Sequence, residues 1–329
     1  MENPTEDLPP PYTPVAEPPS EPTPREKRRR RRLHTYWALV TLVAFIAGSI
    51  GGYFLGSQKH GSMGAAPGEM ADLVKQINPP EGYRIEATFG DLGPELLEAG
   101  ALELDAFVQV YERAGQPLNE EHLAILQGSS PAQLVFNREN AYFLLNFFWA
   151  LGLTNTNPVL TEGPMVRDGR ENAVNYASTG GWSLAAKPVQ DLYASVELVP
   201  LTPEQQERLE AVAQEVYRPC CDNPTDFPDC NHGMAMLGLL ELMASQGASE
   251  DEMLQAAKYA NAYWYPQQTL ELATYFKVSQ KADFDRADSR QLVSRRFSSR
   301  TGFQTVHQWL ATNGLLQQAP GGGNSCGVQ

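Results

Sequence analysis

The sequence predicts an all-α fold class: a single transmembrane helix followed by a multi-helix extracytoplasmic globular domain. Residues 35–56 form an apolar run that contains no Asp, Glu, Lys, Arg or His. Beyond this run, helix start and stop signals recur along the chain, and residues 83–89 alternate as a short strand does. A hydrophobic fraction of 42% over 329 residues is large enough for a substantial core.

Residues 1–34 are expected to form a disordered, proline-rich cytoplasmic tail that ends in the basic cluster 25–32, because few of their side chains are apolar. As a helix, the run 35–56 would be about 33 Å long at about 1.5 Å per residue, close to the thickness of the hydrocarbon core of a bilayer. The arginines lie on its N-terminal side, which places the N terminus in the cytoplasm and the remaining chain outside the cell membrane.

A cleaved signal peptide is the alternative interpretation of this run. Residues 64–66 (Gly-Ala-Ala) have the small side chains found at cleavage sites. The run is longer than the usual apolar region of a signal peptide, about 7–15 residues, and a long tail precedes it. An uncleaved signal anchor, and hence a single-pass membrane protein, is therefore the preferred interpretation.

The composition bears on binding partners in two ways. Gly48, Gly52 and Gly56 are spaced four residues apart, which gives the membrane helix a flat face and indicates a candidate surface for self-association. The chain beyond residue 34 carries 18 basic and 33 acidic residues. This acidic balance is unsuited to nucleic acid, whose binding needs a basic face.

A linker is expected at residues 57–68, the helical domain at 69–318 and a flexible glycine-rich tail at 319–329. Ser, Thr, Asn and Asp caps mark several helix starts, and glycine marks several ends. The predicted helices cover residues 67–77, 94–99, 102–114, 120–127, 137–153, 202–217, 230–246, 249–265, 266–277 and 303–313.

The run at residues 137–153 is apolar on nearly every face. It is shorter than a membrane span, so a buried core helix is expected, and a second dip into the membrane is the alternative. Residues 155–181 are rich in Asn, Gly, Ser, Thr and Pro and are expected to be mostly loop. Tyr176 and Trp182 are expected to hold this loop against the domain.

The stretch at residues 217–236 is the most informative part of the chain. It holds the adjacent pair Cys220 and Cys221, then Cys230 and His232 at the predicted start of a helix capped by Asp229. Prolines at positions 219, 224 and 228 prevent a helix between the cysteines, so the connection is a constrained loop. A stiff loop that gathers thiols and an imidazole suits a metal site or a thiol–disulfide centre.

Metal binding is the first interpretation of this loop. The candidate ligands are Cys220, Cys221, Cys230, His232 and, from the C-terminal tail, Cys326. A set of three thiolates and one imidazole favours Zn²⁺, whereas inclusion of a nearby methionine would favour Cu⁺. The spacing matches no standard zinc finger, and a c-type haem is not expected because the CxxCH motif is absent.

Two further interpretations stay open. One is a structural disulfide, for example between Cys221 and Cys230, because thiols outside the cytoplasm tend to oxidise. The other is thiol redox chemistry, because a helix N-terminus stabilises a thiolate. Cys326 can pair with any of the other three cysteines, form an intermolecular disulfide or stay free.

The residues after the loop carry a resemblance. The order of a cysteine loop, a helix, the residues 247–252 (Gly-Ala-Ser-Glu-Asp-Glu) and a further helix resembles the cysteine-loop domain of the cytochrome c maturation thiol reductase subunit. The resemblance covers residues 217–262 and implies a thiol reductase role. The family has a CxxC pair where this chain has Cys220 and Cys221 in direct succession.

The acidic segment around Asp283, Asp285 and Asp288 lacks the glycine-centred loop of an EF-hand and is expected to be a solvated turn. The sequence thus predicts a membrane-anchored helical domain that presents a Cys/His site for a transition metal. A redox protein of the cytochrome c maturation type and a scaffolding protein with a structural disulfide are the alternatives. Whether the protein is an enzyme stays open.

Overall fold

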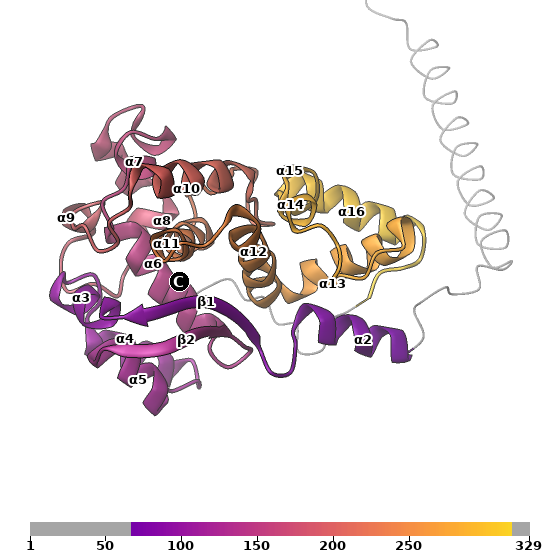
Figure 1. Ribbon diagram of the computed structural model, residues 1–329, viewed down its shortest axis with the longest axis horizontal. Helices are drawn as coiled ribbons and strands as arrows, with labels where there is room; N and C mark the ends of the chain where they lie inside the picture. The colour runs from indigo at the N-terminus through magenta and orange to yellow at the C-terminus, as the bar shows by residue number, and fades with distance from the viewer. Residues whose placement is uncertain (1–66, 318–329) are drawn as a thin grey trace, which may run out of the picture. The chain divides into compact units, whose positions relative to one another are not determined.

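Helices dominate residues 67–317, the part of the chain that the computed structural model describes (Figure 1). These residues belong to one unit of the chain, which spans residues 62–329. The predicted tail 1–34, membrane span 35–56, C-terminal tail 319–329 and nearly all of the linker 57–68 lie outside the described residues. Between residues 67 and 317, every helix is too short or too polar to traverse a bilayer.

The first part of the domain combines short helices with two strands. Its elements are α2 (Pro67–Ile77), β1 (Tyr83–Gly90), α3 (Leu92–Glu98), α4 (Leu104–Arg113), α5 (Glu120–Gln127), β2 (Ser130–Phe136) and α6 (Ala141–Thr154). Asn119 accepts from the backbone N–H of His122 and caps α5, as its position before the helix predicts.

The strands β1 and β2 form a two-stranded antiparallel sheet, in which Tyr83 lies opposite Phe136. The predicted strand 83–89 is confirmed, but the sequence analysis missed its partner, so the fold is mainly helical rather than purely so. β2 contains Pro131, and only its second half alternates between buried and partly exposed side chains. Its pattern is therefore weak, and pairing with β1 decides its structure.

The second part of the domain begins with short helical turns: α7 (Pro158–Thr161), η1 (Pro164–Val166), η2 (Arg170–Asn175), α8 (Ala177–Gly180) and α9 (Val189–Leu192). They occupy most of the segment expected to be loop. As predicted, two aromatic residues hold this segment to the domain. The indole N–H of Trp182 donates to the carbonyl oxygen of Ala101 at 2.8 Å, and Tyr176 packs edge-on against Phe227.

The remaining elements are α10 (Pro203–Glu215), α11 (Asn231–Ser245), α12 (Glu250–Trp264), α13 (Pro266–Tyr275), the π-helical turn η3 (Phe276–Gln280), α14 (Ser289–Val293), α15 (Arg295–Ser298) and α16 (Arg300–Thr312). The predicted threonine cap of α10 at Thr202 is confirmed, and so is the predicted capping box of α12 at Ser249. At Thr202 the structure adds Gln205, which completes a capping box there as well. Several predicted helix starts are wrong. The helix α11 is capped by Cys230 rather than Asp229, α16 begins at Arg300 rather than Phe303, and α6 begins at Ala141 rather than Asn137. The starts of α3 and α4 differ from the prediction by two residues each.

The main core lies between α6 and α11, which pack along each other (Figure 1). Glycines allow this close approach: a Cβ built on Gly152 would lie 2.2 Å from the carbonyl oxygen of Met234, and one on Gly238 would lie 2.4 Å from that of Phe148. Nearly every residue of α6 is buried, which confirms the expected core helix. The single polar side chain in its middle, Asn146, donates to the hydroxyl of Tyr111.

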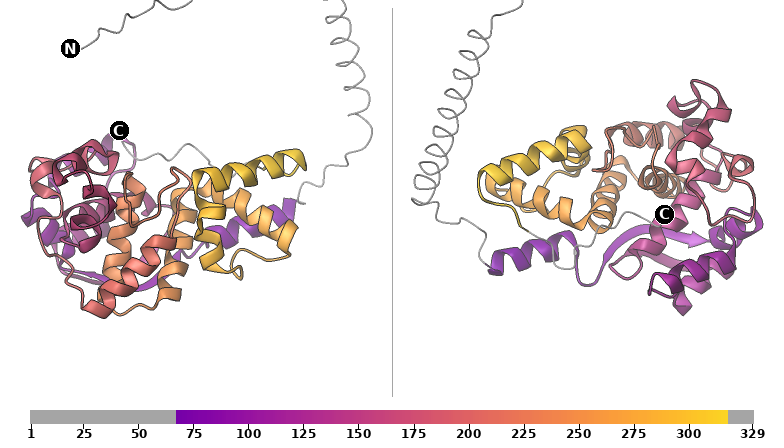
Figure 2. Two further views of the ribbon diagram at one scale, coloured as in Figure 1. Left: turned by 90° about the horizontal axis from the view of Figure 1, so that it is seen from above. Right: turned by 180° about the vertical axis from the view of Figure 1, so that it is seen from behind.

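A second core is built by the C-terminal helices. α16 packs against α13, and α13 packs against α2, so that the two ends of the described chain meet in one hydrophobic cluster (Figures 1 and 2). Between them, the acidic segment forms the expected turn. Asp283 pairs with Lys277 at 2.7 Å, Asp288 caps α14, and the buried amine of Lys258 donates to the carbonyl oxygen of Phe284.

The main core contains one buried carboxyl group that forms no ion pair within residues 67–317. Glu241 lies in α11 and is fully buried, and burial raises the pKa of its carboxyl well above the usual value, although the side chain of Asn155 partly opposes this shift. Its pKa in the folded state is thus above that in the unfolded state. The contribution of this carboxyl group to the free energy of unfolding is therefore fully present below the unfolded pKa of about 4.3. It is lost as pH rises through the folded pKa, because the folded state resists ionisation.

Replacing Glu241 with glutamine is therefore expected to raise the unfolding free energy at neutral pH by about 1–3 kcal/mol, since a neutral amide avoids burying a charge. Denaturant unfolding between pH 5 and 8 would test this expectation, because the advantage of the variant should grow with pH. The same substitution at the exposed Glu207 serves as the control. An advantage that is independent of pH would contradict the assignment.

Candidate metal centre

The cysteine loop, residues 216–230, connects α10 to α11 and is closed by its own backbone. Both the N–H and the hydroxyl of Thr225 donate to the carbonyl oxygen of Val216 at 3.0 Å, and Asp226 N–H donates to that of Ala213 at 3.1 Å. Because the prolines exclude a helix here, these bonds fold the loop back on itself. The two ends of the loop, with their cysteines, are thereby brought together.

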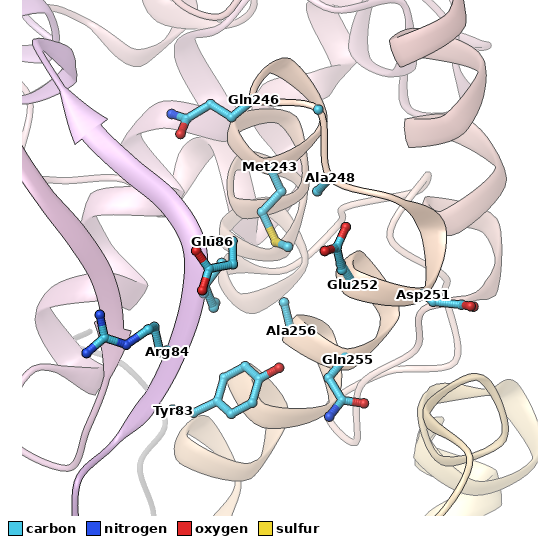
Figure 3. Close-up of a pocket in the computed structure, with 12 residues that line it drawn as sticks. Tyr83, Arg84, Glu86, Met243, Gln246, Ala248, Asp251, Glu252, Gln255 and Ala256 are labelled. Atoms are coloured by element: carbon cyan, nitrogen blue, oxygen red, sulfur yellow. The ribbon is translucent and has the colours of Figure 1, made fainter.

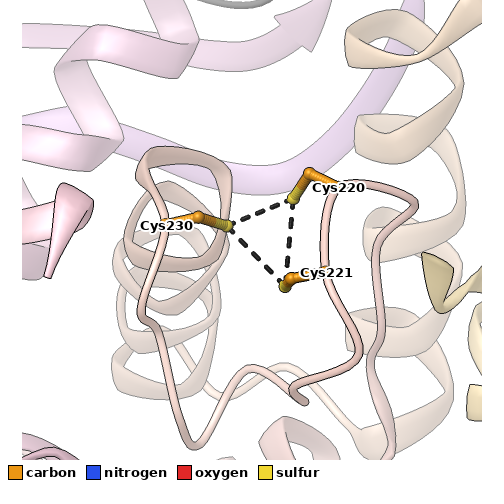
Figure 4. Close-up of side chains that lie close together, drawn as sticks. All are labelled: Cys220, Cys221 and Cys230. Atoms are coloured by element: carbon orange, nitrogen blue, oxygen red, sulfur yellow. Dashed lines mark hydrogen bonds between the residues drawn. The ribbon is translucent and has the colours of Figure 1, made fainter.

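Three sulfur atoms meet where the loop closes (Figure 4). The Sγ atoms of Cys220 and Cys230 are 3.2 Å apart, and that of Cys221 lies 4.0 Å from each of the other two. Among residues 67–317, these three sulfurs form the group of potential metal-ligand atoms from Cys, His, Asp or Glu that all lie within 4.8 Å of one another. All three cysteines are free thiols, so the thiol cluster could hold a metal ion.

The spacing of the sulfurs suits a single ion. In a tetrahedral site with metal–sulfur bonds of about 2.3 Å, the sulfur atoms lie about 3.8 Å apart. Two of the observed separations are 4.0 Å and the third is 3.2 Å, so adjustments of a few tenths of an ångström would bring the three to a common ion. The connecting loop needs no rearrangement to supply three ligands from two segments.

Cys230 is held at the N-terminus of α11. Its sulfur accepts from the backbone N–H of Gly233 at 3.4 Å, so the thiol takes the role of the helix cap. The sequence analysis assigned this role to Asp229, whose carboxylate is instead directed at Arg218 and Asn223. A helix N-terminus stabilises negative charge, which favours the thiolate form of Cys230.

Arg218 is a residue of this candidate site that the sequence did not predict. Its side chain is 0% exposed, and its Nε donates to the sulfur of Cys230 at 3.2 Å. The other guanidinium nitrogens donate to the carbonyl oxygens of Asn223 and Phe227 and to the carboxylate of Asp229 at 3.2 Å. The guanidinium thus joins the middle of the loop to the thiol cluster and places a fixed positive charge beside it.

The three thiols differ in acidity. Hydrogen bonds from Cys220 and Cys221 hold the pKa of Cys230 well below the usual range, and the charge of Arg218 adds to this effect. Hydrogen bonds to the other two thiols, together with burial, raise the pKa of Cys220. The pKa of Cys221 rises to about 12, because the hydrogen bond to Cys230 and burial outweigh the opposing bond to Cys220. Cys230 is therefore the first thiol to ionise.

His232 is close to the thiol cluster without belonging to it. Its ring is 3% exposed, Nδ1 lies 3.0 Å from Oδ1 of Asn231, and Nε2 is buried without a hydrogen-bond partner. The ring packs against that of Tyr265, with centroids 4.5 Å apart. Burial lowers the pKa of His232 to about 4, so its imidazole is neutral at pH 7. Cys326, the remaining predicted ligand, lies outside the described residues.

The domain contains a second candidate site, a surface cavity. A cavity of about 380 Å³ lies between β1, the end of α11 and the start of α12 (Figure 3). Two of its three acidic side chains have structural roles: Glu86 accepts from Gln133, and Glu252 caps its own helix at Ser249. The amide of Gln246 is likewise bonded to the backbone of Thr88. The described residues that line this cavity include no cysteine or histidine.

Comparison with known proteins adds no relative. No protein-family model matches the chain, and no match was found among curated proteins or solved structures. The resemblance of residues 217–262 to the thiol reductase subunit therefore stays a sequence-based prediction, and the chemistry of the thiol cluster rests on its own geometry.

Proposed function

We propose that this domain binds a transition metal ion through the thiolates of Cys220, Cys221 and Cys230, and that Zn²⁺ is the preferred ion. The observation that carries the proposal is the convergence of three sulfur atoms within 4.8 Å of one another, one of which accepts a hydrogen bond from a fully buried arginine. Thiolates are strong ligands for Zn²⁺ and Cu⁺. The pKa values of the three thiols shift in opposite directions, because each thiol changes the ionisation of its neighbours. A bound metal ion would stabilise all three as thiolates.

Charge balance favours zinc over copper. Three thiolates with Zn²⁺ carry one net negative charge, which the guanidinium of Arg218 can offset from within hydrogen-bonding distance of Cys230. The same thiolates with Cu⁺ carry two, and unbalanced buried charge is costly. Asp229, the other charged partner of Arg218, has a side chain that is 23% exposed, so solvent screens part of its charge.

Tetrahedral zinc needs a fourth ligand. His232 is the described candidate, since it follows Cys230 by two residues and its imidazole is buried and neutral. Cys326 and a water molecule are the alternatives. Zinc affinity in the His232→Gln and Cys326→Ser variants would distinguish them, since loss of the true ligand should weaken binding more than loss of the other.

The full-length chain, purified without chelators, is expected to contain about one zinc ion per chain. The Cys221→Ser variant should lose most of the metal, because one thiolate is removed from the centre of the site. The matched control is Ser294→Cys, which adds a thiol elsewhere in the described chain. Metal content measured by elemental analysis, together with thiol reactivity before and after chelation, tests the proposal. Wild-type protein without bound metal, whose thiols react only after reduction, would refute it.

A redox role is the second candidate, supported by the 3.2 Å separation of the Cys220 and Cys230 sulfurs and the acidic Cys230 thiol. Here the Cys230 thiolate would attack a substrate disulfide, and Cys220 would resolve the mixed disulfide. Both substrate sulfurs would leave as thiols, and Cys220 and Cys230 would become linked. A reduction potential well above that of structural disulfides, measured in glutathione buffers, would favour this role over metal storage in the same site.

Membrane anchoring is a separate proposal, based on the apolar run 35–56 and its preceding arginines. It places the N terminus in the cytoplasm and the thiol cluster on the other side of the membrane. Protease treatment of intact cells with a permeabilised envelope should digest the C-terminal domain. Full protection of that domain would reverse the proposed orientation.

A further inference from the structure

We infer that the first turn of α16 positions Cys220 and Cys221 for metal binding, an inference that rests on the proposed function. This turn, residues 299–301, lies about 80 positions along the chain from the two cysteines and belongs to the helices of the second core. It nevertheless makes direct contacts with three consecutive residues of the cysteine loop. Arg300 and Thr301 are thus positioning residues for the site rather than ligands.

The backbone of both cysteines is bonded to Arg300. Its side-chain Nε donates to the carbonyl oxygen of Cys220 at 3.0 Å, and a second guanidinium nitrogen donates to the same oxygen. Its backbone N–H donates to the carbonyl oxygen of Cys221 at 2.9 Å. One residue therefore holds the peptide groups that carry two of the three sulfurs.

Asp222, the next residue of the loop, is bonded to Thr301. Its Oδ1 accepts from the backbone N–H at 2.9 Å and from the hydroxyl at 2.7 Å. The loop thus docks on α16 through backbone and side-chain atoms of consecutive residues. Such a pattern fixes the direction of the loop as well as its distance from the helix.

These bonds also provide acceptors for the backbone N–H groups at the start of α16. The first N–H groups of a helix have no partner within it. In α16, those of Arg300 and Thr301 are taken by the loop, and that of Gly302 by the hydroxyl of Ser299 at 3.1 Å. A helix that would otherwise expose these donors is therefore capped by the metal-binding loop, so the loop and the helix each stabilise the position of the other.

The thiol cluster consequently depends on two helix N-termini. Cys230 is fixed by α11, whereas Cys220 and Cys221 are fixed by α16. The separation between the sulfurs therefore follows from how α16 is placed relative to α11. Releasing the loop from α16 should leave all three ligands present but poorly aligned, which is the signature of lost positioning.

The test replaces Asp222 in the full-length protein and uses Co²⁺ as the probe, because its visible absorption reports tetrahedral thiolate coordination. Asp222→Ala removes the acceptor for Thr301 and is expected to weaken Co²⁺ binding about 10–100-fold, the range for residues that orient metal ligands. Asp222→Asn keeps a side-chain oxygen and should restore binding to within about threefold. Thr312→Val, at an exposed position near the other end of α16, is the control and should bind as wild type does.

A second measurement does not require metal. In the metal-free protein, oxidant-driven disulfide formation between Cys220 and Cys230, the closest pair of sulfurs, should be about tenfold slower in Asp222→Ala, because the sulfurs are held together less of the time. A variant that is less stable but unchanged in Co²⁺ spectrum, affinity and cross-linking rate would overturn the inference. If wild type binds no Co²⁺, the proposed function fails, and the cross-linking rates still decide whether α16 positions the cysteines.

Discussion

Replacing Arg218 with methionine is expected to destabilise the protein by about 3–5 kcal/mol, because removing one partner of a buried charged network leaves the others unpaired. The guanidinium is 0% exposed and bonds Cys230, Asp229 and two backbone carbonyl groups. Methionine fills a similar volume but donates no hydrogen bond. The acceptors left behind would each bear a desolvation penalty.

The same variant should bind zinc about 10–100-fold more weakly, as expected when a residue that bonds a metal ligand is lost. Without the guanidinium, the charge on a coordinated Cys230 thiolate is no longer offset. Chemical unfolding and competition with a zinc chelator would measure the two effects. The stability and zinc affinity of Arg218→Lys should fall between those of wild type and Arg218→Met. Lysine retains the positive charge, but its single ammonium group cannot bond all the acceptors that the planar guanidinium bonds.

Arg290 provides a matched control for this substitution. It pairs with Glu215 and Glu250, as Arg218 pairs with Asp229, but its side chain is 43% exposed. Ion pairs in that setting contribute about 0–1 kcal/mol, so Arg290→Met should be nearly neutral and should bind zinc normally. Equal effects of the two substitutions would mean that burial of Arg218 has no special role.

The parts of the fold that local sequence determines were predicted well. The cap at Thr202 and the capping box at Ser249 depend on residues at most three positions apart, and both are present. The cysteine loop was also recognisable, because closely spaced prolines limit its backbone and the cysteines at its two ends are few residues apart. A short segment of chain therefore brings Cys220, Cys221 and Cys230 into one region, whereas the distances between their sulfurs also depend on the contacts of the loop with α11 and α16.

The remaining features depend on contacts between distant segments. Arginine is normally exposed, so nothing near Arg218 in the sequence indicates that a loop will close around it. The first turn of α16 was missed because its N–H groups are capped by Asp222 and Cys221 rather than by neighbouring residues alone. Likewise, β2 is a strand because β1 lies beside it. Local patterns cannot reveal partners of this kind.

Replacing Gly233 with alanine is expected to destabilise the protein by about 2–3 kcal/mol, although alanine favours a helix by about 1 kcal/mol. A Cβ built on Gly233 would lie 2.2 Å from a terminal nitrogen of Arg218 and 2.5 Å from its Cζ. The guanidinium fills the space beside the first turn of α11 and cannot move without breaking its bonds. Gly128→Ala is the control, because its nearest contact is 3.4 Å and its φ of −142° suits any residue.

The combination of Gly233→Ala with Arg218→Met separates this steric explanation from a general intolerance of α11. A methionine at position 218 has no guanidinium for the alanine to displace, so the second substitution should cost much less in that background. The double variant should therefore be more stable than the sum of the single effects predicts, by about 1 kcal/mol or more, within the range found for residues in contact.

Strictly additive changes in the free energy of unfolding would show that the two positions act independently. In that case Gly233 would be required for some property of the helix start itself, and the guanidinium would have to be placed elsewhere. Non-additivity would instead show that Gly233 is required because a side chain there would displace the guanidinium beside Cys230.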